Sequence, residues 1–238
     1  MACSRYRNPR VKPAWYKARQ RSITPAQKAA ERTLWPLFGL VFSYNQPLDI
    51  DAAFGRVSAP TALEIGCGAG EALVEYAAAR PDVNFIGVDW YRSGLASCLQ
   101  EIERRDLQNV RLCRADALML LEVGLPAMPL LDEVLVFFPD PWRGSPERRI
   151  MRPDVMKQLS RRMRPSGQLR FASDVPGYPE DVQELLASHE AAGGQWRHVP
   201  SDERWRPSTK YAREAAVAGR AVQDLCFEFI SSAGESGE

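Results

Sequence analysis

Histidines and paired cysteines are scarce in this sequence, and their scarcity argues against several kinds of site. His189 and His198 are the only histidines among 238 residues, and neither belongs to a recognisable catalytic triad. The five cysteines are odd in number and contain no C-x-x-C pair, which argues against a disulfide framework and against a zinc site. We therefore expect no metal and a reducing, cytoplasmic environment.

Long hydrophobic runs are also absent. The apolar stretches stay far below the roughly 20 residues that span a bilayer, and the first residues, Met-Ala-Cys-Ser-Arg-Tyr-Arg, contain no apolar segment of a signal peptide. The composition, with 45% hydrophobic, 26% charged and 9% aromatic residues, is typical of one ordinary globular domain. We expect a protein that is neither secreted nor inserted in a membrane.

The net charge is only +1, but this value averages over segments of opposite sign. Residues 1–32 contain nine Lys or Arg against Glu31, and residues 143–170 contain nine against two acids. Tyr6, Trp15 and Tyr16 lie within the first segment, and such a segment suits a phosphate backbone and stacked bases. A solvated terminus explains the charge equally well. We predict a basic N-terminal extension over 1–32, the main domain over 33–230 and a disordered tail over 231–238.

An α/β rhythm runs from residue 61 to the C-terminus. Before it, Thr24 followed by Pro25 predicts the start of a helix, and residues 48–54 are expected to form a connector. Strands that alternate with helices of about 10–15 residues predict βαβ units, a mostly parallel sheet and helices on both of its faces. The strands are expected at 62–65, 85–88, 110–113, 134–138, 169–172 and 224–230, and the helices at 71–80, 93–105, 154–163 and 179–192.

A glycine-rich loop follows the first predicted strand. Gly66, Gly68 and Gly70 allow a sharp turn and a close approach of the backbone to a ligand at the start of the next helix. A dinucleotide fingerprint needs glycine at position 71, where Glu71 would instead repel a pyrophosphate, and this disfavours a nicotinamide oxidoreductase. Glu64, before the loop, suits S-adenosylmethionine, which has no phosphate and whose ammonium and sulfonium need negative or polar neighbours.

Acidic residues also end the next two predicted strands. Asp89, followed by Trp90, lies where a carboxylate can accept from both ribose hydroxyls of a nucleotide-like ligand. Asp116 and Ala117 lie where a carboxylate can accept from the adenine amino group and a main-chain N–H can donate to the ring. Three acids at three successive strand ends, together with the glycine loop, favour a cofactor site over three separate helix caps.

The fourth predicted strand runs into Pro139-Asp140-Pro141-Trp142. The two prolines fix the backbone and aim the Asp140 carboxylate from the strand end, where α/β sheets bind ligands. Trp142 offers a flat face, so the pair suits a planar base that carries N–H groups; a turn with a buried tryptophan is the alternative. Asp174 follows the fifth strand at the same edge.

These motifs resemble those of the bacterial tRNA (guanine-N7)-methyltransferases, which methylate guanosine in the variable loop of tRNA. The resemblance runs from about Arg19 to Phe229 and is most specific in the run Phe-Phe-Pro-Asp-Pro-Trp at 137–142. It extends to the segments 23–27, 172–174, 206–211 and 222–227. It implies a class I S-adenosylmethionine-dependent methyltransferase fold, which is α/β and Rossmann-like, with S-adenosyl-L-methionine as cofactor and tRNA as partner.

The resemblance also implies roles for individual residues. For the cofactor they are Glu64, Gly66, Gly68, Gly70, Asp89, Trp90, Asp116 and Ala117; for catalysis Asp140, which also matches a cofactor-site acid; and for the substrate Trp142, Asp174, Thr209, Lys210 and Tyr211. Guanine N7 carries a lone pair and no proton, so transfer to it needs alignment rather than a general base. We expect Asp140 to orient the guanine.

Two positions depart from the family pattern. Gly144 stands where the family usually has a lysine, and Ala212 stands where it has a glutamate. Both losses fall on the nucleic-acid side of the pattern and leave the cofactor side whole. An N-methyltransferase for a small purine-like heterocycle therefore stays open as the alternative, and a catalytically silent RNA-binding paralogue is a third, less favoured one.

Overall fold

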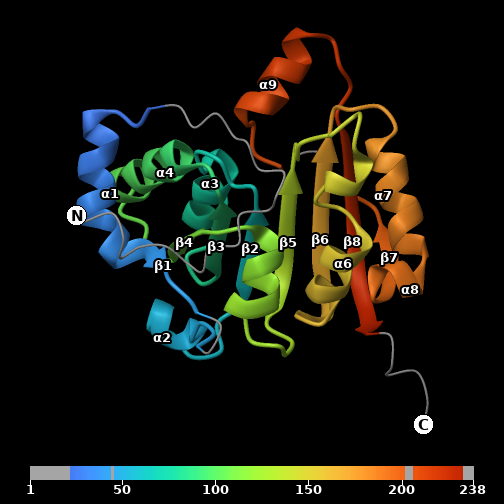
Figure 1. Cartoon of the computed structure of the whole chain (residues 1–238), viewed down its shortest axis with the longest axis horizontal. Coiled ribbons are helices and arrows are strands. Elements are labelled where there is room, and N and C mark those ends of the chain that lie inside the picture. The colour runs from blue at the N-terminus through green and yellow to red at the C-terminus, as the bar shows by residue number, and fades with distance from the viewer. Residues whose placement is uncertain (1–21, 44–45, 202–205, 233–238) are drawn as a thin grey trace. The chain divides into compact units, whose positions relative to one another are not determined.

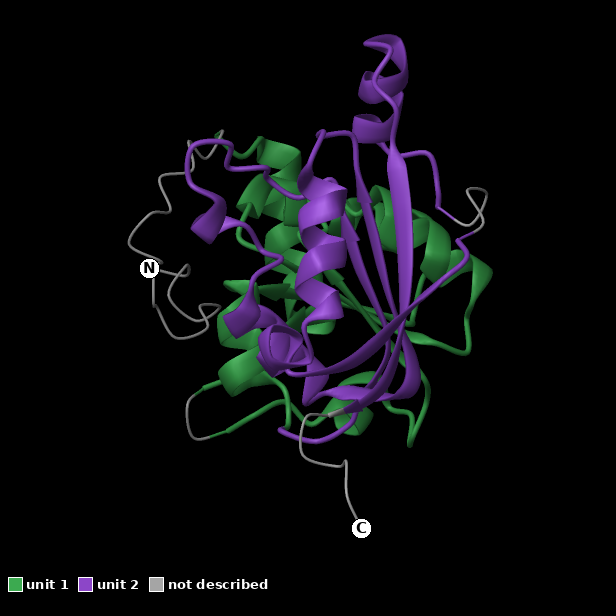
Figure 2. Ribbon diagram, turned by 90° about the vertical axis from the view of Figure 1, so that its right-hand side faces the viewer, with its two compact units in different colours: residues 1–126 green, residues 127–238 purple. Residues whose placement is uncertain are grey.

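A computed structural model of the chain describes residues 22–43, 46–201 and 206–232. The chain divides into two compact units, residues 1–126 (unit 1) and residues 127–238 (unit 2), which Figure 2 colours separately. Most of the expected basic extension, residues 1–21, and most of the expected tail, residues 233–238, lie outside the described residues. The first helix runs through residue 32, so the last part of the expected extension is helical.

Unit 1 contains four parallel strands, in the spatial order β1-β4-β3-β2 (Figure 1). All five residues of β2 are buried, as is typical of parallel strands covered on both faces. The three longer strands lie where the sequence predicts them, whereas the two-residue β1 is too short to leave a pattern. The strands are β1 (Gly39–Leu40), β2 (Thr61–Ile65), β3 (Asn84–Asp89) and β4 (Val110–Arg114).

The helices of unit 1 are α1 (Pro25–Phe38), α2 (Ile50–Phe54), α3 (Glu71–Ala79), α4 (Arg92–Arg104), α5 (Ala117–Met119) and the π-helix η1 (Leu120–Gly124). Both α1 and α3 pack against α4, and Leu34 and Trp35 of α1 join a core with apolar residues of α3, α4 and the strands. The expectation of a connector at 48–54 is wrong, because α2 lies there. Asp49 caps its start and Gly55, in the left-handed conformation, ends it.

Unit 2 contains four strands in the order β5-β6-β8-β7. They are β5 (Leu131–Phe137), β6 (Met163–Ser173), β7 (Gly194–Val199) and β8 (Gln223–Ser232). β5 and β6 are parallel, whereas β8 runs antiparallel to both of its neighbours. The sequence does not reveal β7, because this strand exposes the polar residues Gln195, Arg197 and His198.

The helices of unit 2 are the 3₁₀-helix η2 (Pro146–Arg148), α6 (Pro153–Ser160), α7 (Tyr178–Ala187), α8 (His189–Ala192) and α9 (Lys210–Val217), the helix at the top of Figure 1. Two predicted helices are wrong in extent. The helix expected at 154–163 ends at Ser160, because Met163 already belongs to β6. The helix expected at 179–192 breaks at Ser188, whose side chain caps α8.

The parallel strands place the site. The carboxyl ends of β2, β3 and β4 share one edge in unit 1, and those of β5 and β6 share one edge in unit 2. Within the described part of the chain, no helix is long and apolar enough to cross a membrane.

Replacing Thr24 with alanine tests the predicted helix start. The Thr24 hydroxyl accepts from the Gln27 backbone N–H (3.2 Å), and the side-chain oxygen Oε1 of Gln27 accepts from the Thr24 N–H (2.9 Å). The side-chain amide Nε2 of Gln27 also donates to the Ser97 hydroxyl of α4 (2.9 Å). Thr24→Ala should lower the free energy of unfolding by about 1 kcal/mol in a urea titration. Thr33→Ala, at an exposed position within the same helix, is the control; an equal loss there would contradict the capping role.

Candidate functional site

The glycine loop between β2 and α3 requires glycine for its backbone. Gly66, Gly68 and Gly70 have φ angles of 77°, 55° and 79°, in the left-handed region that other residues avoid. Gly70 has a second constraint, since a Cβ there would lie 2.2 Å from Cys98 Sγ of α4. The loop therefore presents bare backbone at the start of α3, as close approach of a ligand requires.

Asp89, at the end of β3, holds this loop in place. One of its carboxylate oxygens accepts from the Gly68 N–H (2.8 Å) and the other from the Tyr91 N–H (2.7 Å). An ionised carboxylate has about four acceptor positions, so each oxygen can also accept from a ligand hydroxyl. Asp89 thus joins two loops of the strand edge and can still bind a ribose diol.

Glu64 is a buried carboxyl group one residue before the end of β2. Its side chain is 4% exposed, and Oε2 has no hydrogen-bond partner among the described residues. Burial, reinforced by the negative charge of Asp89, raises its pKa to about 8, although a hydrogen bond from the Leu73 backbone N–H opposes the shift. Glu64 is therefore protonated at neutral pH unless a cation lies beside it.

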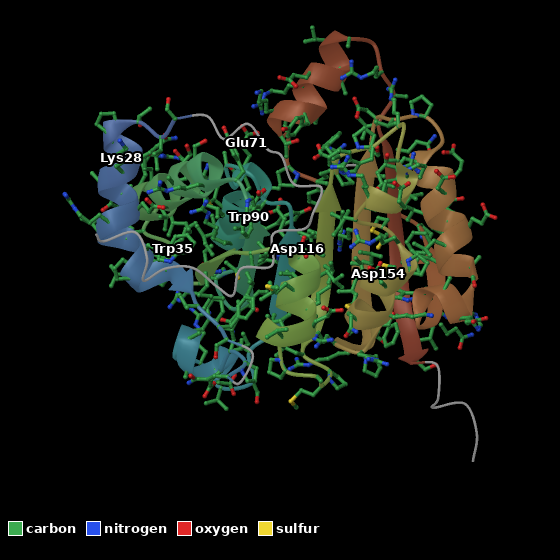
Figure 3. All side chains as sticks on the ribbon, in the orientation of Figure 1. Lys28, Trp35, Glu71, Trp90, Asp116 and Asp154 are labelled. Carbon is green, nitrogen blue, oxygen red and sulfur yellow. The ribbon has the colours of Figure 1, made fainter. Side chains whose placement is uncertain are left out.

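The third strand end carries the residues expected to bind an adenine. Asp116 follows β4 and caps α5, with Oδ1 accepting from the Met119 N–H (3.2 Å), and Ala117 begins that helix. Trp90 follows β3, and its ring lies 5.9 Å from the Arg114 guanidinium carbon. Figure 3 labels Trp90 and Asp116 among the side chains of unit 1. The eight residues expected at the cofactor all lie at the carboxyl ends of β2, β3 and β4 or in the segments that follow them directly.

Asp140 lies in a constrained loop after β5. Phe138 and Trp142, two residues before and after it, have φ angles of 49° and 41°, which is uncommon for side chains of this size. Pro139 and Pro141 flank it directly and provide no backbone N–H. The Asp140 side chain is exposed. The loop thus presents one carboxylate to the surroundings.

Trp142 is less open than the sequence suggests. The Arg148 guanidinium carbon lies 3.5 Å from the centroid of its ring, in a cation–π stack. Its carbonyl also accepts from the Ser145 N–H (2.8 Å), which closes a turn. One face of the ring is therefore covered by an arginine, and stacking on a base is confined to the opposite face.

Asp174 follows β6 and is engaged in an ion pair. Its carboxylate accepts from the Arg220 side chain (2.6 Å), which comes from the segment after α9. Thr209 is buried and caps α9, with its hydroxyl accepting from the Ala212 N–H (3.3 Å). Both groups expected at the substrate therefore already have protein partners.

Lys210 and Tyr211 begin α9. Lys210 lies 3.6 Å from Glu214 one turn later. Tyr211 is 57% exposed and stacks on Phe138, with ring centroids 6.1 Å apart. The stack links the C-terminal motif to the residue two positions before Asp140.

The sequence gives no indication of a buried ion pair behind this stack. Arg206 donates to both carboxylate oxygens of Asp224 (2.6 and 3.1 Å), and both side chains are at most 10% exposed. The Arg206 guanidinium carbon lies 5.2 Å from the Phe138 ring. Both residues fall in the segments that resemble the family, but they lie eighteen positions apart, and this separation gives no signal that they pair.

Among the residues described, no three His, Cys, Asp or Glu side chains gather as metal ligands would.

Solved structures share this fold. A 16S rRNA methyltransferase, KamB, aligns with a TM-score of 0.57 at 21% identity over 76% of this chain and 94% of its own. A 16S rRNA (adenine(1408)-N(1))-methyltransferase from Catenulisporales acidiphilia, solved with S-adenosylmethionine, aligns with a TM-score of 0.56 at 21% identity over 81% of this chain and 96% of its own. A protein family described as "Putative methyltransferase" matches residues 58–225. Fold and sequence together define a class I S-adenosylmethionine-dependent methyltransferase, as the sequence predicts.

Curated relatives narrow the class to one family. The tRNA (guanine-N(7)-)-methyltransferase of Halorhodospira halophila is 39% identical over 88% of this chain and 91% of its own length. The enzyme of the same name from Alcanivorax borkumensis is 38% identical over 88% of each chain, and that of Nocardia farcinica is 39% identical over 88% of this chain and 81% of its own. The chain belongs to the tRNA (guanine-N(7)-)-methyltransferase family, which confirms the resemblance.

Glu64 should make the stability of the ligand-free protein depend on pH. Because its pKa is raised from 4.5 to about 8 in the folded state, the folded protein binds more protons than the unfolded chain between these values. The contribution of Glu64 to the free energy of unfolding is present at low pH. It is lost as pH rises, by up to roughly 1 kcal/mol per pH unit. Glu64→Gln should remove this slope from urea titrations between pH 5 and 8. The exposed Glu75→Gln is the control, and an unchanged slope in Glu64→Gln would contradict the burial argument.

Two alanine substitutions separate backbone strain from packing in the loop. Gly66→Ala should lower the free energy of unfolding by roughly 1–2 kcal/mol. A Cβ there would touch no other atom, so the only cost is that of a left-handed backbone with a side chain. Gly70→Ala should cost more, because its Cβ would also collide with Cys98 Sγ. Adding Cys98→Ala should recover part of the Gly70→Ala loss in the same denaturation assay, and no recovery would contradict the steric explanation.

Proposed function

We propose that this protein transfers the methyl group of S-adenosylmethionine to N7 of a guanosine in tRNA, in the cytoplasm. The observation that carries the proposal is family membership, with 38–39% identity over 88% of the chain, combined with the exposed Asp140 between two prolines after β5. Residues 33–230 are assigned to methyl transfer, and residues 1–32 to contact with the phosphate backbone of the RNA.

The residues proposed to bind the cofactor lie in unit 1. S-adenosylmethionine brings an electrophilic methyl group on a sulfonium. Glu64 pairs with the cationic amino-acid part, and the Asp89 oxygens accept from the ribose hydroxyls. The Asp116 carboxylate and the Ala117 N–H bind the adenine, beside Trp90. Gly66, Gly68 and Gly70 give the ligand access to the backbone.

Unit 2 supplies the acceptor half. The N7 lone pair would attack the methyl carbon while its bond to sulfur breaks, so that S-adenosylhomocysteine leaves as a neutral thioether and the positive charge passes to the methylated base. No proton is released, so alignment supplies much of the rate and no general base is needed. Asp140 accepts from the N1–H and the amino group of guanine and so fixes the direction of N7. Asp174 and Thr209 assist on the base, while Trp142, Lys210 and Tyr211 contact the surrounding nucleotide; these substrate roles rest on the resemblance.

Gly144 and Ala212 are the observations that favour a small heterocyclic acceptor. At Gly144 a Cβ would meet nothing within 4 Å, so the loop keeps its conformation with or without a side chain there. Ala212 lies in the first turn of α9, which is mostly exposed. Neither departure blocks the site. The sequence identity to tRNA enzymes over most of the chain therefore favours tRNA as the acceptor.

Asp140→Ala tests the proposal. Labelled S-adenosylmethionine and an unmodified tRNA transcript should yield 7-methylguanosine with the wild-type protein, identified by nucleoside analysis. The Asp140→Ala variant should lose at least 10²-fold in rate, with S-adenosylmethionine affinity unchanged within twofold by calorimetry. Asp132→Ala, at the opposite end of β5, is the matched control. Transfer by Asp140→Ala at the wild-type rate would contradict the role, and label on free purine analogues but not on tRNA would favour the alternative acceptor.

Restoring the family lysine gives a second test. Gly144→Lys should fold normally, because the position is exposed and open. It should lower the KM for tRNA several-fold at low salt and leave the S-adenosylmethionine affinity unchanged, because a cation there adds one phosphate contact. Gly144→Gln is the uncharged control. Equal effects of Lys and Gln, or none from either, would contradict a charge-dependent phosphate contact at this position.

A further inference from the structure

We infer that Arg149 is a positioning residue for the reaction: its guanidinium fastens Pro141 to helix α7 and thereby fixes the direction of the neighbouring Asp140 carboxylate. The inference rests on the proposed function for its catalytic consequence, and on the contacts of unit 2 for its structural one.

One guanidinium makes three contacts, one with the loop after β5 and two with helix α7. Arg149 Nε donates to the Pro141 carbonyl oxygen (2.8 Å), and Nη1 forms an ion pair with Asp181. The guanidinium carbon also lies 4.4 Å from the centroid of the Tyr178 ring. The Arg149 side chain is only 13% exposed. A planar fork with several donors suits such a set of contacts, whereas a lysine ammonium does not.

The partners of Arg149 are themselves well fixed. Tyr178 is fully buried and packs edge-to-face on Phe171 of β6, with ring centroids 5.2 Å apart. Asp181 lies on the next turn of α7, so both partners present themselves on one side of that helix. The Arg149 carbonyl accepts from Arg152 Nη1 (3.0 Å), which restrains its backbone as well. Arg149 therefore holds Pro141 at a fixed place relative to α7.

The loop around Asp140 depends on such outside support. Its two prolines cannot donate hydrogen bonds, and the left-handed backbone at Phe138 and Trp142 costs energy that the surrounding structure must offset. The Phe138 N–H donates to the Ala172 carbonyl (2.8 Å) and fixes the loop at its start. The charge-assisted bond from Arg149 reaches the carbonyl of Pro141, the residue directly after Asp140.

Removing this contact should therefore leave β5 intact and release the carboxylate. Displacement of a reacting group by about 1 Å can lower a rate by roughly 10²-fold. The loss should appear in kcat for methyl transfer and not in the affinity for S-adenosylmethionine, which the residues of unit 1 bind.

Four variants separate positioning from general stability. Arg149→Ala removes all three contacts, Arg149→Lys keeps the charge but not the fork, and Asp181→Asn weakens one anchor. Arg164→Ala is the matched control, because Arg164 pairs with Asp132 at the opposite end of β5 (3.1 Å). Each full-length variant is assayed for kcat and KM on tRNA, for S-adenosylmethionine binding by calorimetry, and for amide hydrogen exchange in peptides covering 137–152.

Arg149→Ala is expected to lose 10- to 100-fold in kcat with S-adenosylmethionine affinity unchanged, and to exchange faster at 137–152. Arg149→Lys and Asp181→Asn should be intermediate, and Arg164→Ala should match the wild type in kcat and at 137–152. Millimolar methylguanidinium should restore part of the Arg149→Ala rate and leave Arg164→Ala unchanged.

Wild-type kcat in Arg149→Ala, or equal losses in Arg149→Ala and Arg164→Ala, would overturn the inference while leaving the proposed function standing. If the wild-type protein transfers no methyl to tRNA, the proposed function fails and the exchange data decide the structural part. Unchanged exchange at 137–152 in Arg149→Ala would then overturn it, and faster exchange there, absent from Arg164→Ala, would uphold it.

Discussion

Two backbone N–H groups, from Gly68 and Tyr91, donate to the single carboxylate of Asp89, and the conformation of the glycine loop depends on that arrangement. Asp89 ends β3, while Gly68 belongs to the loop after β2, so one side chain joins two neighbouring strand ends. The left-handed glycines make the loop possible, and Asp89 selects one of its conformations. Glu64 is then held beside this loop without a partner for one oxygen, which is a costly state unless a proton or a cation is supplied.

In unit 2, arginine side chains hold loops and carboxylates in position. The loop that carries Asp140 lacks two backbone donors because of its prolines, and the Arg149 guanidinium supports it from outside. Arg149 holds Pro141, Arg206 lies beside Phe138 and pairs with the buried Asp224, and Arg220 pairs with Asp174. A guanidinium is planar, always charged and offers several donors, so a few such residues can fix carboxylates and carbonyls that no regular secondary structure reaches.

The sequence predicts the elements that have a clear hydrophobic pattern or a residue that marks their start. Apolar runs predict β2 to β6 and β8, and the Thr24-Pro25 pair predicts α1. The glycines and acids predict cofactor residues at strand ends, and the structure places them there, while their binding role stays a prediction. What it missed depends on long-range pairing or on weak patterns. β7 has no apolar run, because several of its residues are polar and exposed. α2 spans only about one turn, which is too short for a helical pattern. Arg206 and Asp224 form an ion pair although they lie eighteen positions apart. The engagement of Asp174 by Arg220 was equally beyond local pattern, because it joins residues forty-six positions apart.

In the proposed reaction, alignment and not proton transfer drives the methyl transfer to N7. The most direct test is the single-turnover rate with saturating S-adenosylmethionine and tRNA, measured from pH 6 to pH 8. Saturation removes any effect of Glu64 protonation on cofactor affinity. The rate should stay constant within about twofold, because N7 has no proton to lose. A rate that rises tenfold per pH unit would reveal an essential general base and would rule out transfer by alignment alone.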